Sequence, residues 1–191
     1  MPDVDIDLAD RDVLLKHIKH VPARLEKRKH NTGVYTHRVP VDPLSNWCTV
    51  DYKNAESLDY FKLDLLNVSI YKDVHSEAHL QELMEREPIW ELLEHAEFTK
   101  DVFHLSGNED LVKKLAPKNL EQLASTLAII RPSKRHLAKD VDWDRIEKEV
   151  WLKPEDGSYY FKKAHAFSYA MACVVHMNLL CERLSKEKDN V

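Results

Sequence analysis

The sequence predicts an α+β fold built in two parts, and three features of the 191-residue chain carry this prediction. Up to about residue 75, short segments with alternating or β-branched residues are separated by prolines and polar stretches, a pattern typical of strands. Beyond that position, apolar residues recur at helical spacing between breaks at proline and glycine. The chain is 43% hydrophobic and 32% charged, so a packed interior is expected. We therefore expect a small mixed region over 1–74 and a helical region over 75–191.

The mixed region begins with a predicted strand over residues 3–8, where three aspartates alternate with three aliphatic side chains. Because successive side chains of a strand point to opposite faces, the three carboxylates would share one face. A helical pattern starts at Asp10 and runs to Leu25, with Pro22 expected to break or kink it. We expect three further strands, over 33–39, 47–52 and 60–66.

The helical region contains one long apolar stretch, Ala164 to Leu180, which polar residues interrupt. It falls short of the roughly 20 apolar residues that a bilayer-spanning helix needs, so we expect a buried core helix. The acidic N-terminus is unlike a signal peptide, and free cysteines fit a reducing compartment. The expected location is the cytoplasm, with no membrane partner. The helices are expected over 77–86, 89–97, 109–115, 119–130, 142–150 and 164–184.

Composition excludes several enzyme classes. The chain has only three glycines, which lie too far apart for a dinucleotide-binding loop, a Walker-type phosphate loop or the nucleophile elbow of a serine hydrolase. Its three cysteines, Cys48, Cys173 and Cys181, form no Cys-x-x-Cys pair, which argues against a zinc ribbon or a disulfide framework. The formal net charge of −5 argues against binding DNA through overall charge, although a local basic stripe could still bind it.

Asp5, Asp7 and Asp64 are the candidate catalytic residues. Asp5 and Asp7 would lie about 6.5–7 Å apart on one face of a strand, where like charges repel unless a cation neutralises them. Divalent metals held by carboxylates from two strands are one solution, and hard oxygen ligands favour Mg²⁺ or Mn²⁺. A solvent-facing acidic strand is the alternative. Asp64 lies between apolar residues, and Lys62 beside it could hold a nucleotide phosphate or form a structural ion pair with Asp64.

These segments, taken in chain order, resemble the palm of C-family DNA polymerases, the catalytic alpha subunit of bacterial DNA polymerase III. The palm-like motifs are Pro-Asp-Val-Asp-Ile-Asp at 2–7, His30-Asn-Thr-Gly33-Val34 and Lys62-Leu-Asp64-Leu. Farther along, Arg131-Pro132 is similar to an element that ends a helix in the family's fingers. Phe161-Lys-Lys163-Ala-His165 with Tyr169-Ala170 is similar to a helix motif of the family. The matched elements keep the family's order over almost the whole chain.

The resemblance implies a function and a set of site residues. Asp5, Asp7 and Asp64 match the carboxylates that hold two catalytic metal ions, Mg²⁺ or Mn²⁺, in template-directed DNA synthesis. A primer 3′-hydroxyl would attack the α-phosphorus of a deoxynucleoside triphosphate, and the metals would activate the hydroxyl and stabilise the leaving pyrophosphate. The implied partners are a DNA primer–template, deoxynucleoside triphosphates and another polymerase chain or replisome component. The residues implied to contact the nucleotide's phosphates are Lys62, Arg131, Lys163 and His165.

The chain also departs from the family. It begins at the first aspartate motif, Asp64 follows Asp7 after a shorter interval than in the full-length enzymes, and Ser133-Lys134 stands where the family has Gly-Pro. We therefore expect a reduced nucleotidyltransferase-type palm over 1–74 and a fingers-like region over 75–191, in a truncated or miniature homologue. Compact replication genes of this kind are commonest in phages, so the expected setting is a bacterial cell or a phage-infected host.

Two other functions compete with the polymerase. A non-catalytic replication protein would keep the polymerase shape in order to bind a replisome partner or DNA. The missing upstream palm and the net charge of −5 favour this alternative. A phosphodiesterase would keep the metals and use water as its nucleophile.

Two further groups of basic residues have a possible role in binding. His75 and His79 are spaced i, i+4 on an expected helix and could ligate a metal, but solvated helix histidines are the favoured interpretation. A basic stripe could contact a phosphate backbone or lie solvated in a loop. Its members are Arg131, Lys134, Arg135, His136 and Lys139.

Overall fold

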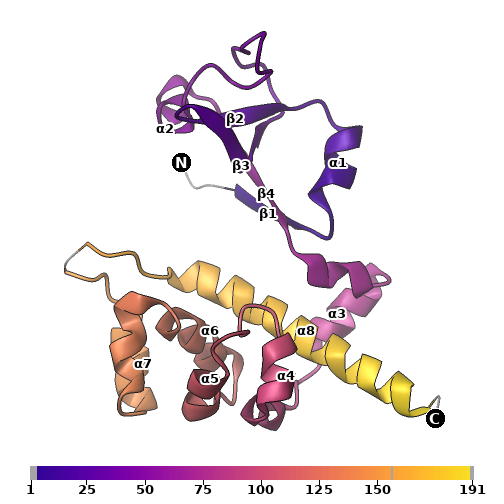
Figure 1. Cartoon of the computed structure of the whole chain (residues 1–191), viewed down its shortest axis with the longest axis vertical. Helices are drawn as coiled ribbons and strands as arrows, with labels where there is room; N and C mark the ends of the chain where they lie inside the picture. The colour runs from indigo at the N-terminus through magenta and orange to yellow at the C-terminus, as the bar shows by residue number, and fades with distance from the viewer. Residues whose placement is uncertain (1–3, 156, 190–191) are drawn as a thin grey trace. The chain divides into compact units, whose positions relative to one another are not determined.

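The structure is a computed structural model that describes residues 4–155 and 157–189, and it divides into two compact units. Unit 1 comprises Met1–Asp73 and unit 2 comprises Val74–Val191. The described part of unit 1 holds a four-stranded sheet, and helices form the regular elements described in unit 2 (Figure 1). The α+β class predicted from the sequence is therefore confirmed.

The sheet of unit 1 has the strand order β1-β4-β3-β2. β1 and β4 are parallel, whereas β3 is antiparallel to both of its neighbours. Asp5 pairs with Asp64 across the β1–β4 ladder, and Gly33 pairs with Asp64 across the β3–β4 ladder. These three positions thus form one row across the sheet. The strands are β1 (Val4–Leu8), β2 (Val21–Leu25), β3 (Arg28–Tyr35) and β4 (Leu63–Asn67).

The predicted first strand is confirmed, apart from Asp3, which lies outside the described residues. The predicted helix over 10–25 is wrong in its second half, because α1 (Arg11–His17) ends early and β2 follows it. Pro22 is compatible with β2 because this strand lies at the edge of the sheet. A proline there removes a backbone donor without interrupting a ladder inside the sheet.

The predicted strand over 47–52 is also wrong. Asp51 caps the short helix α2 (Tyr52–Ala55), and its carboxylate accepts the backbone N–H of Lys53 at 3.0 Å. Cys48 makes an isolated bridge in place of a ladder. A capping aspartate in this segment thus starts a helix where the β-rich composition predicted a strand. The two remaining short elements of unit 1 are η1 (Glu56–Leu58) and η2 (Ser69–Asp73).

Unit 2 is organised around α8 (Lys163–Asp189), against which α6 (Leu120–Ile129) packs (Figure 1). Every residue of α6 from Leu123 to the end of the helix is buried. The helices predicted for unit 2 are confirmed, except that 89–97 divides into a 3₁₀ segment and the start of a separate helix. The remaining elements are α3 (Glu77–Glu85), η3 (Trp90–Glu94), α4 (Ala96–Asp101), α5 (Glu109–Leu115), η4 (Pro132–Ala138) and α7 (Trp143–Glu149).

The apolar helix α8 is longer than the sequence prediction allowed. By length and composition alone, Lys163–Lys188 could cross a membrane, so the expectation that this stretch is too short is wrong. Within the protein, however, 56% of its most apolar 18-residue window is buried. Ala166, Ala170 and Cys173 on this helix belong to the hydrophobic core of unit 2. These contacts are those of a helix packed into a hydrophobic core.

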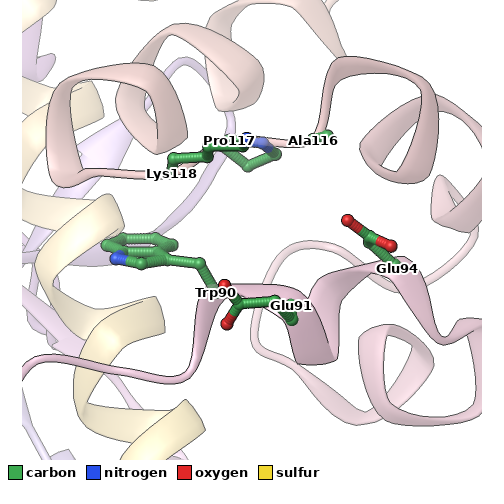
Figure 2. Close-up of a pocket in the computed structure, with 6 residues that line it drawn as sticks. All are labelled: Trp90, Glu91, Glu94, Ala116, Pro117 and Lys118. Atoms are coloured by element: carbon green, nitrogen blue, oxygen red, sulfur yellow. The ribbon is translucent and has the colours of Figure 1, made fainter.

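A small hollow in unit 2 lies between η3 and the turn that follows α5 (Figure 2). Figure 2 shows Trp90 and Glu94 on one side of it and Pro117 and Lys118 on the other. Its volume is about 20 Å³, which is room for about one water molecule. This hollow is therefore too small to be a ligand site.

Candidate functional site

Asp64 is the most deeply buried of the three predicted catalytic carboxylates, with 8% of its surface exposed. Its Oδ1 accepts a hydrogen bond from the Thr32 hydroxyl at 2.8 Å, and its Oδ2 forms an ion pair with Lys62 Nζ. The Nδ1 atom of His30 lies 3.9 Å from Oδ1. A charged carboxylate at this depth needs partners such as Thr32 and Lys62, because an unpaired charge in the interior is costly. Both oxygens of Asp64 are thus engaged by the protein itself.

Lys62 is held in place by its surroundings, and its side chain is only 10% exposed. Besides the ion pair with Asp64, Lys62 Nζ lies 5.5 Å from the centroid of the Tyr52 ring, within the range of a cation–π interaction. Its aliphatic stem packs on Gly33, where an added Cβ would lie 2.7 Å from Lys62 Cδ. The structural ion pair, one of the two interpretations drawn from the sequence, is therefore present. A phosphate would have to compete with Asp64 for this ammonium group.

His30 and Gly33, which match the His-x-x-Gly-Val motif, form the framework beside Asp64. The backbone N–H of Gly33 donates to His30 Nδ1 at 2.9 Å, so a neutral His30 ring carries its proton on Nε2. The His30 ring also meets the ring of Tyr52 edge-on, with centroids 5.0 Å apart. The motif thus fixes the end of β3 that lies next to Asp64, and Gly33 leaves the space that Lys62 fills.

Asp5 and Asp7 lie on β1 and are more exposed than Asp64, although the surroundings of Asp7 still remove part of its solvent. Because Asp5 is in register with Asp64 and Asp7 is two positions farther along its strand, all three carboxylates belong to one face of two neighbouring strands. Partial burial and, to a lesser extent, the negative charge of Asp5 raise the pKa of Asp7. The structure therefore brings the three predicted carboxylates and Lys62 to one place in unit 1.

The donor chemistry of this place fits a hard divalent cation, because carboxylate oxygens are the ligands that Mg²⁺ and Mn²⁺ prefer. The side chains are not gathered around such an ion: over 4–155 and 157–189, no group of three His, Cys, Asp or Glu side chains is arranged to hold a metal. The reason lies at Asp64, whose oxygens face Lys62 and Thr32. The residues fit a metal in type and in strand placement, and a metal bound to Asp64 would share the carboxylate with Lys62 and Thr32.

Arg131, Lys163 and His165, the other residues implied to bind phosphate, belong to unit 2. The guanidinium carbon of Arg131 lies 5.2 Å from the centroid of the Phe161 ring, just ahead of α8. Lys163 Nζ lies 5.6 Å from the centroid of the Phe167 ring, and the His165 side chain is exposed. Phe161 thus brings Arg131 close to the segment that leads into Lys163. Both cations contact aromatic rings of their own unit.

The basic stripe predicted after Arg131 is not a continuous solvated surface. Lys134 is buried at 6% exposure, and its Nζ donates to the carbonyl of Glu149 at 2.8 Å, at the end of α7. Burial lowers the pKa of Lys134. This lysine therefore satisfies a carbonyl at a helix C-terminus, and it is unsuited to contact a phosphate backbone.

The interpretation of His79 as a solvated histidine is also wrong. Its Nε2 lies 3.2 Å from Glu182 Oε2 on α8, and Arg86 donates to the other oxygen of the same carboxylate at 2.9 Å. The rings of His75 and His79 stack with centroids 4.9 Å apart. This cluster fastens α3 to α8.

Sequence reasoning missed two members of the Asp64 cluster, Thr32 and Tyr52. Thr32 lies inside the motif that begins at His30, and its position directly before Gly33 was the signal that could have found it. Tyr52 follows the capping residue Asp51, and it reaches the cluster because α2 replaces the predicted strand. A strand in this segment would have placed the ring differently.

Comparisons with protein-family models, with curated proteins and with solved structures find no match for this chain. The link to C-family DNA polymerases therefore rests on the motifs quoted above.

Proposed function

We propose that this chain is a C-family DNA polymerase module, similar to the alpha subunit of DNA polymerase III, that acts in DNA replication together with a partner chain. One observation supports the proposal more than any other: Asp5 and Asp64 are register partners on parallel strands, and Asp7 follows on the same face. Carboxylates that meet from neighbouring strands are suited to two-metal nucleotidyl transfer.

In the proposed reaction, a primer 3′-hydroxyl attacks the α-phosphorus of a deoxynucleoside triphosphate, and pyrophosphate leaves. Asp5, Asp7 and Asp64 would hold Mg²⁺ or Mn²⁺, which when bound supplies a more acidic hydroxyl and neutralises phosphate charge. Thr32 orients Asp64 by donating to Oδ1. Lys62 holds the Asp64 carboxylate in place through their ion pair, and it would carry positive charge beside the incoming phosphates.

The resemblance to the polymerase family also assigns phosphate contacts to Arg131, Lys163 and His165. The cationic groups of Arg131 and Lys163 lie against aromatic rings. An aromatic ring has no net charge, so these contacts position the two cations without neutralising them. The proposed partners are a DNA primer–template, deoxynucleoside triphosphates and another polymerase chain or replisome component.

Primer extension by the full chain with Mg²⁺ or Mn²⁺ tests this proposal. We expect Asp64→Asn and Asp5→Asn to abolish extension, because each removes a charged metal ligand at nearly constant volume. Asp59→Asn is the matched control, since Asp59 is exposed in unit 1 and its left-handed backbone tolerates asparagine. Extension that survives in Asp64→Asn would contradict the mechanism, as would equal losses in Asp64→Asn and Asp59→Asn.

One observation favours a second function: the carboxylate of Asp64 is held by Lys62 and Thr32, as expected if its role is structural. This function is a non-catalytic replication protein that binds a replisome partner or DNA. Titration calorimetry with Mn²⁺ and a deoxynucleoside triphosphate separates the two. Heat that disappears in Asp64→Asn supports the polymerase, and the absence of Asp64-dependent heat supports the binding protein. Release of nucleotides from labelled DNA in the same preparation would instead indicate a phosphodiesterase.

A further inference from the structure

Unit 1 contains a groove that the proposed chemistry does not use. It lies where β2 begins and β3 ends, at the pair formed by Val21 and Tyr35. Its volume is about 430 Å³, within the range of small-ligand sites. Four cationic or ionisable basic side chains line it, and we call it the basic groove: Lys19, His20, His37 and Arg38.

The positive charges of the basic groove are not balanced by acidic side chains in its lining. No aspartate or glutamate is among the described residues that line it. Over residues 4–155 and 157–189, Lys19 and Arg38 form no ion pair. The surrounding segment, 16–38, carries seven lysines and arginines against a single acid, Glu26, in a chain of net charge −5. Arg24 lies near the carboxylates of Asp42 and Asp51, but Lys19 and Arg38 at the groove have no such partner among the described residues. Like charges concentrated in this way attract a polyanion to this part of the surface.

The groove also has an apolar side, formed by Val21, Val39 and Val41. Val41 is 43% exposed, so part of this aliphatic surface is accessible. Lys19, His37 and Arg38 are themselves exposed. Cationic groups beside apolar surface suit a ligand that carries phosphates along one side and bases along the other, as a single strand of nucleic acid does. The four basic groups also exceed what one phosphate would require.

We propose that the basic groove binds single-stranded nucleic acid through its phosphodiester backbone. Lys19 and Arg38 contact phosphates, and the valines contact the sugars or the edges of the bases. The charge and the shape of the groove indicate a polyanion, and the choice of nucleic acid among polyanions rests on the proposed function.

Fluorescence anisotropy of a labelled oligothymidylate with the full chain in EDTA measures this binding separately from catalysis. The test variant is Lys19→Gln/Arg38→Gln. The control variant, Lys53→Gln/Lys72→Gln, removes the same charge from exposed positions of unit 1 outside the groove. We expect the test variant to bind at least about tenfold more weakly and its slope of log K against log salt to be smaller by about 1.4, because each phosphate contact to a single strand contributes about 0.7. The control should keep the wild-type slope.

Three results would overturn the proposal: equal losses in both variants, equal competition by heparin or duplex DNA, and equal competition by thymidine monophosphate at the same phosphate concentration. The second would indicate a general polyanion surface, and the third a site for a single nucleotide. Groove-dependent binding by a wild-type chain that extends no primer would sustain this inference while the proposed function fails.

Discussion

Each unit holds a lysine that is largely buried, and the two lysines have different partners. In unit 1, Lys62 forms an ion pair with the carboxylate of Asp64. In unit 2, Lys134 donates to the backbone carbonyl of Glu149 at 2.8 Å. Lys62 therefore has a carboxylate as its direct partner, whereas Lys134 donates to a helix-terminal carbonyl. Burial lowers the pKa of Lys134, although the negative charge of Glu149 opposes this shift.

The two lysines also differ in their surroundings: Lys62 belongs to the candidate site, and Lys134 belongs to the structural framework of unit 2. Lys62 lies among other polar and ionisable groups, and the core beside it is a small cluster around Ala23, Tyr35 and Cys48. Lys134 lies within η4, next to residues such as Leu137 that belong to the continuous core of unit 2. In the first setting the buried cation belongs to a cluster of polar groups that includes Asp64 and Thr32. In the second setting it fills a structural need of one helix.

Replacing each lysine by methionine tests this comparison. Of the predicted changes, it should have the largest effect on the free energy of unfolding. Lys62→Met should lower the free energy of unfolding by about 3–5 kcal/mol, because it leaves the buried carboxylate of Asp64 without its cation. Lys134→Met should cost only about 1 kcal/mol, since it loses one hydrogen bond and no longer buries a charge. Urea unfolding measures both, and hydrogen exchange assigns each loss to its unit. Equal costs would mean that the two lysines are equivalent.

Gly33→Ala sharpens the comparison from within unit 1. The added methyl would lie 2.7 Å from Lys62 Cδ and 3.0 Å from His30 Nδ1, so it should disturb the Lys62–Asp64 pair and cost about 1–3 kcal/mol. If the clash with Lys62 is the cause, Gly33→Ala/Lys62→Ala should cost less than the sum of its two single changes. Urea unfolding of the four proteins gives this coupling energy, and additive costs would place the strain elsewhere.

The sequence predicted the helices of unit 2 well because their apolar faces and their breaks at proline are local features. It failed in unit 1 where a tertiary contact decided the outcome. Pro22 was expected to end a helix, but its segment is an edge strand, and an edge position is a property of the sheet that no local window contains. The segment at 47–52 has strand-like composition, but the cap at Asp51 starts α2 there.

The candidate site shows the same division between local and tertiary information. The motifs predicted that Asp5 and Asp7 share one face of a strand, and alternation along β1 confirms this spacing. The motifs did not reveal that Thr32 and Tyr52 complete the surroundings of Asp64, because these contacts join separate segments of unit 1. The sequence also could not distinguish Lys134 from its solvated neighbours, since burial beneath α7 depends on packing.

Unit 2 also contains a carboxylate between basic groups, that of Glu182. Because Glu182 is more exposed than Asp64, its charge should contribute less to the free energy of unfolding. Burial alone would raise the pKa of Glu182, but hydrogen bonds from Arg86 and His79 outweigh burial and lower this pKa. A carboxylate whose pKa is lowered by folding stabilises the protein above its unfolded pKa, about 4.3 for glutamate. That stabilisation is lost as the pH falls through the lower folded value.

Glu182→Gln should therefore lower the free energy of unfolding by about 0.5–1 kcal/mol at neutral pH, as expected for a partly exposed ion pair. The difference from the wild type should shrink as the pH falls below about 4, because Glu182 then becomes protonated and uncharged. Urea unfolding at both pH values measures this change, with Glu187→Gln on the exposed end of α8 as the matched control. An undiminished difference in acid would mean that α3 is held to α8 by packing and by neutral hydrogen bonds such as those from Asn178 to the carbonyls of Leu83 and Arg86. In that case the negative charge of Glu182 would contribute nothing measurable to the stability of unit 2.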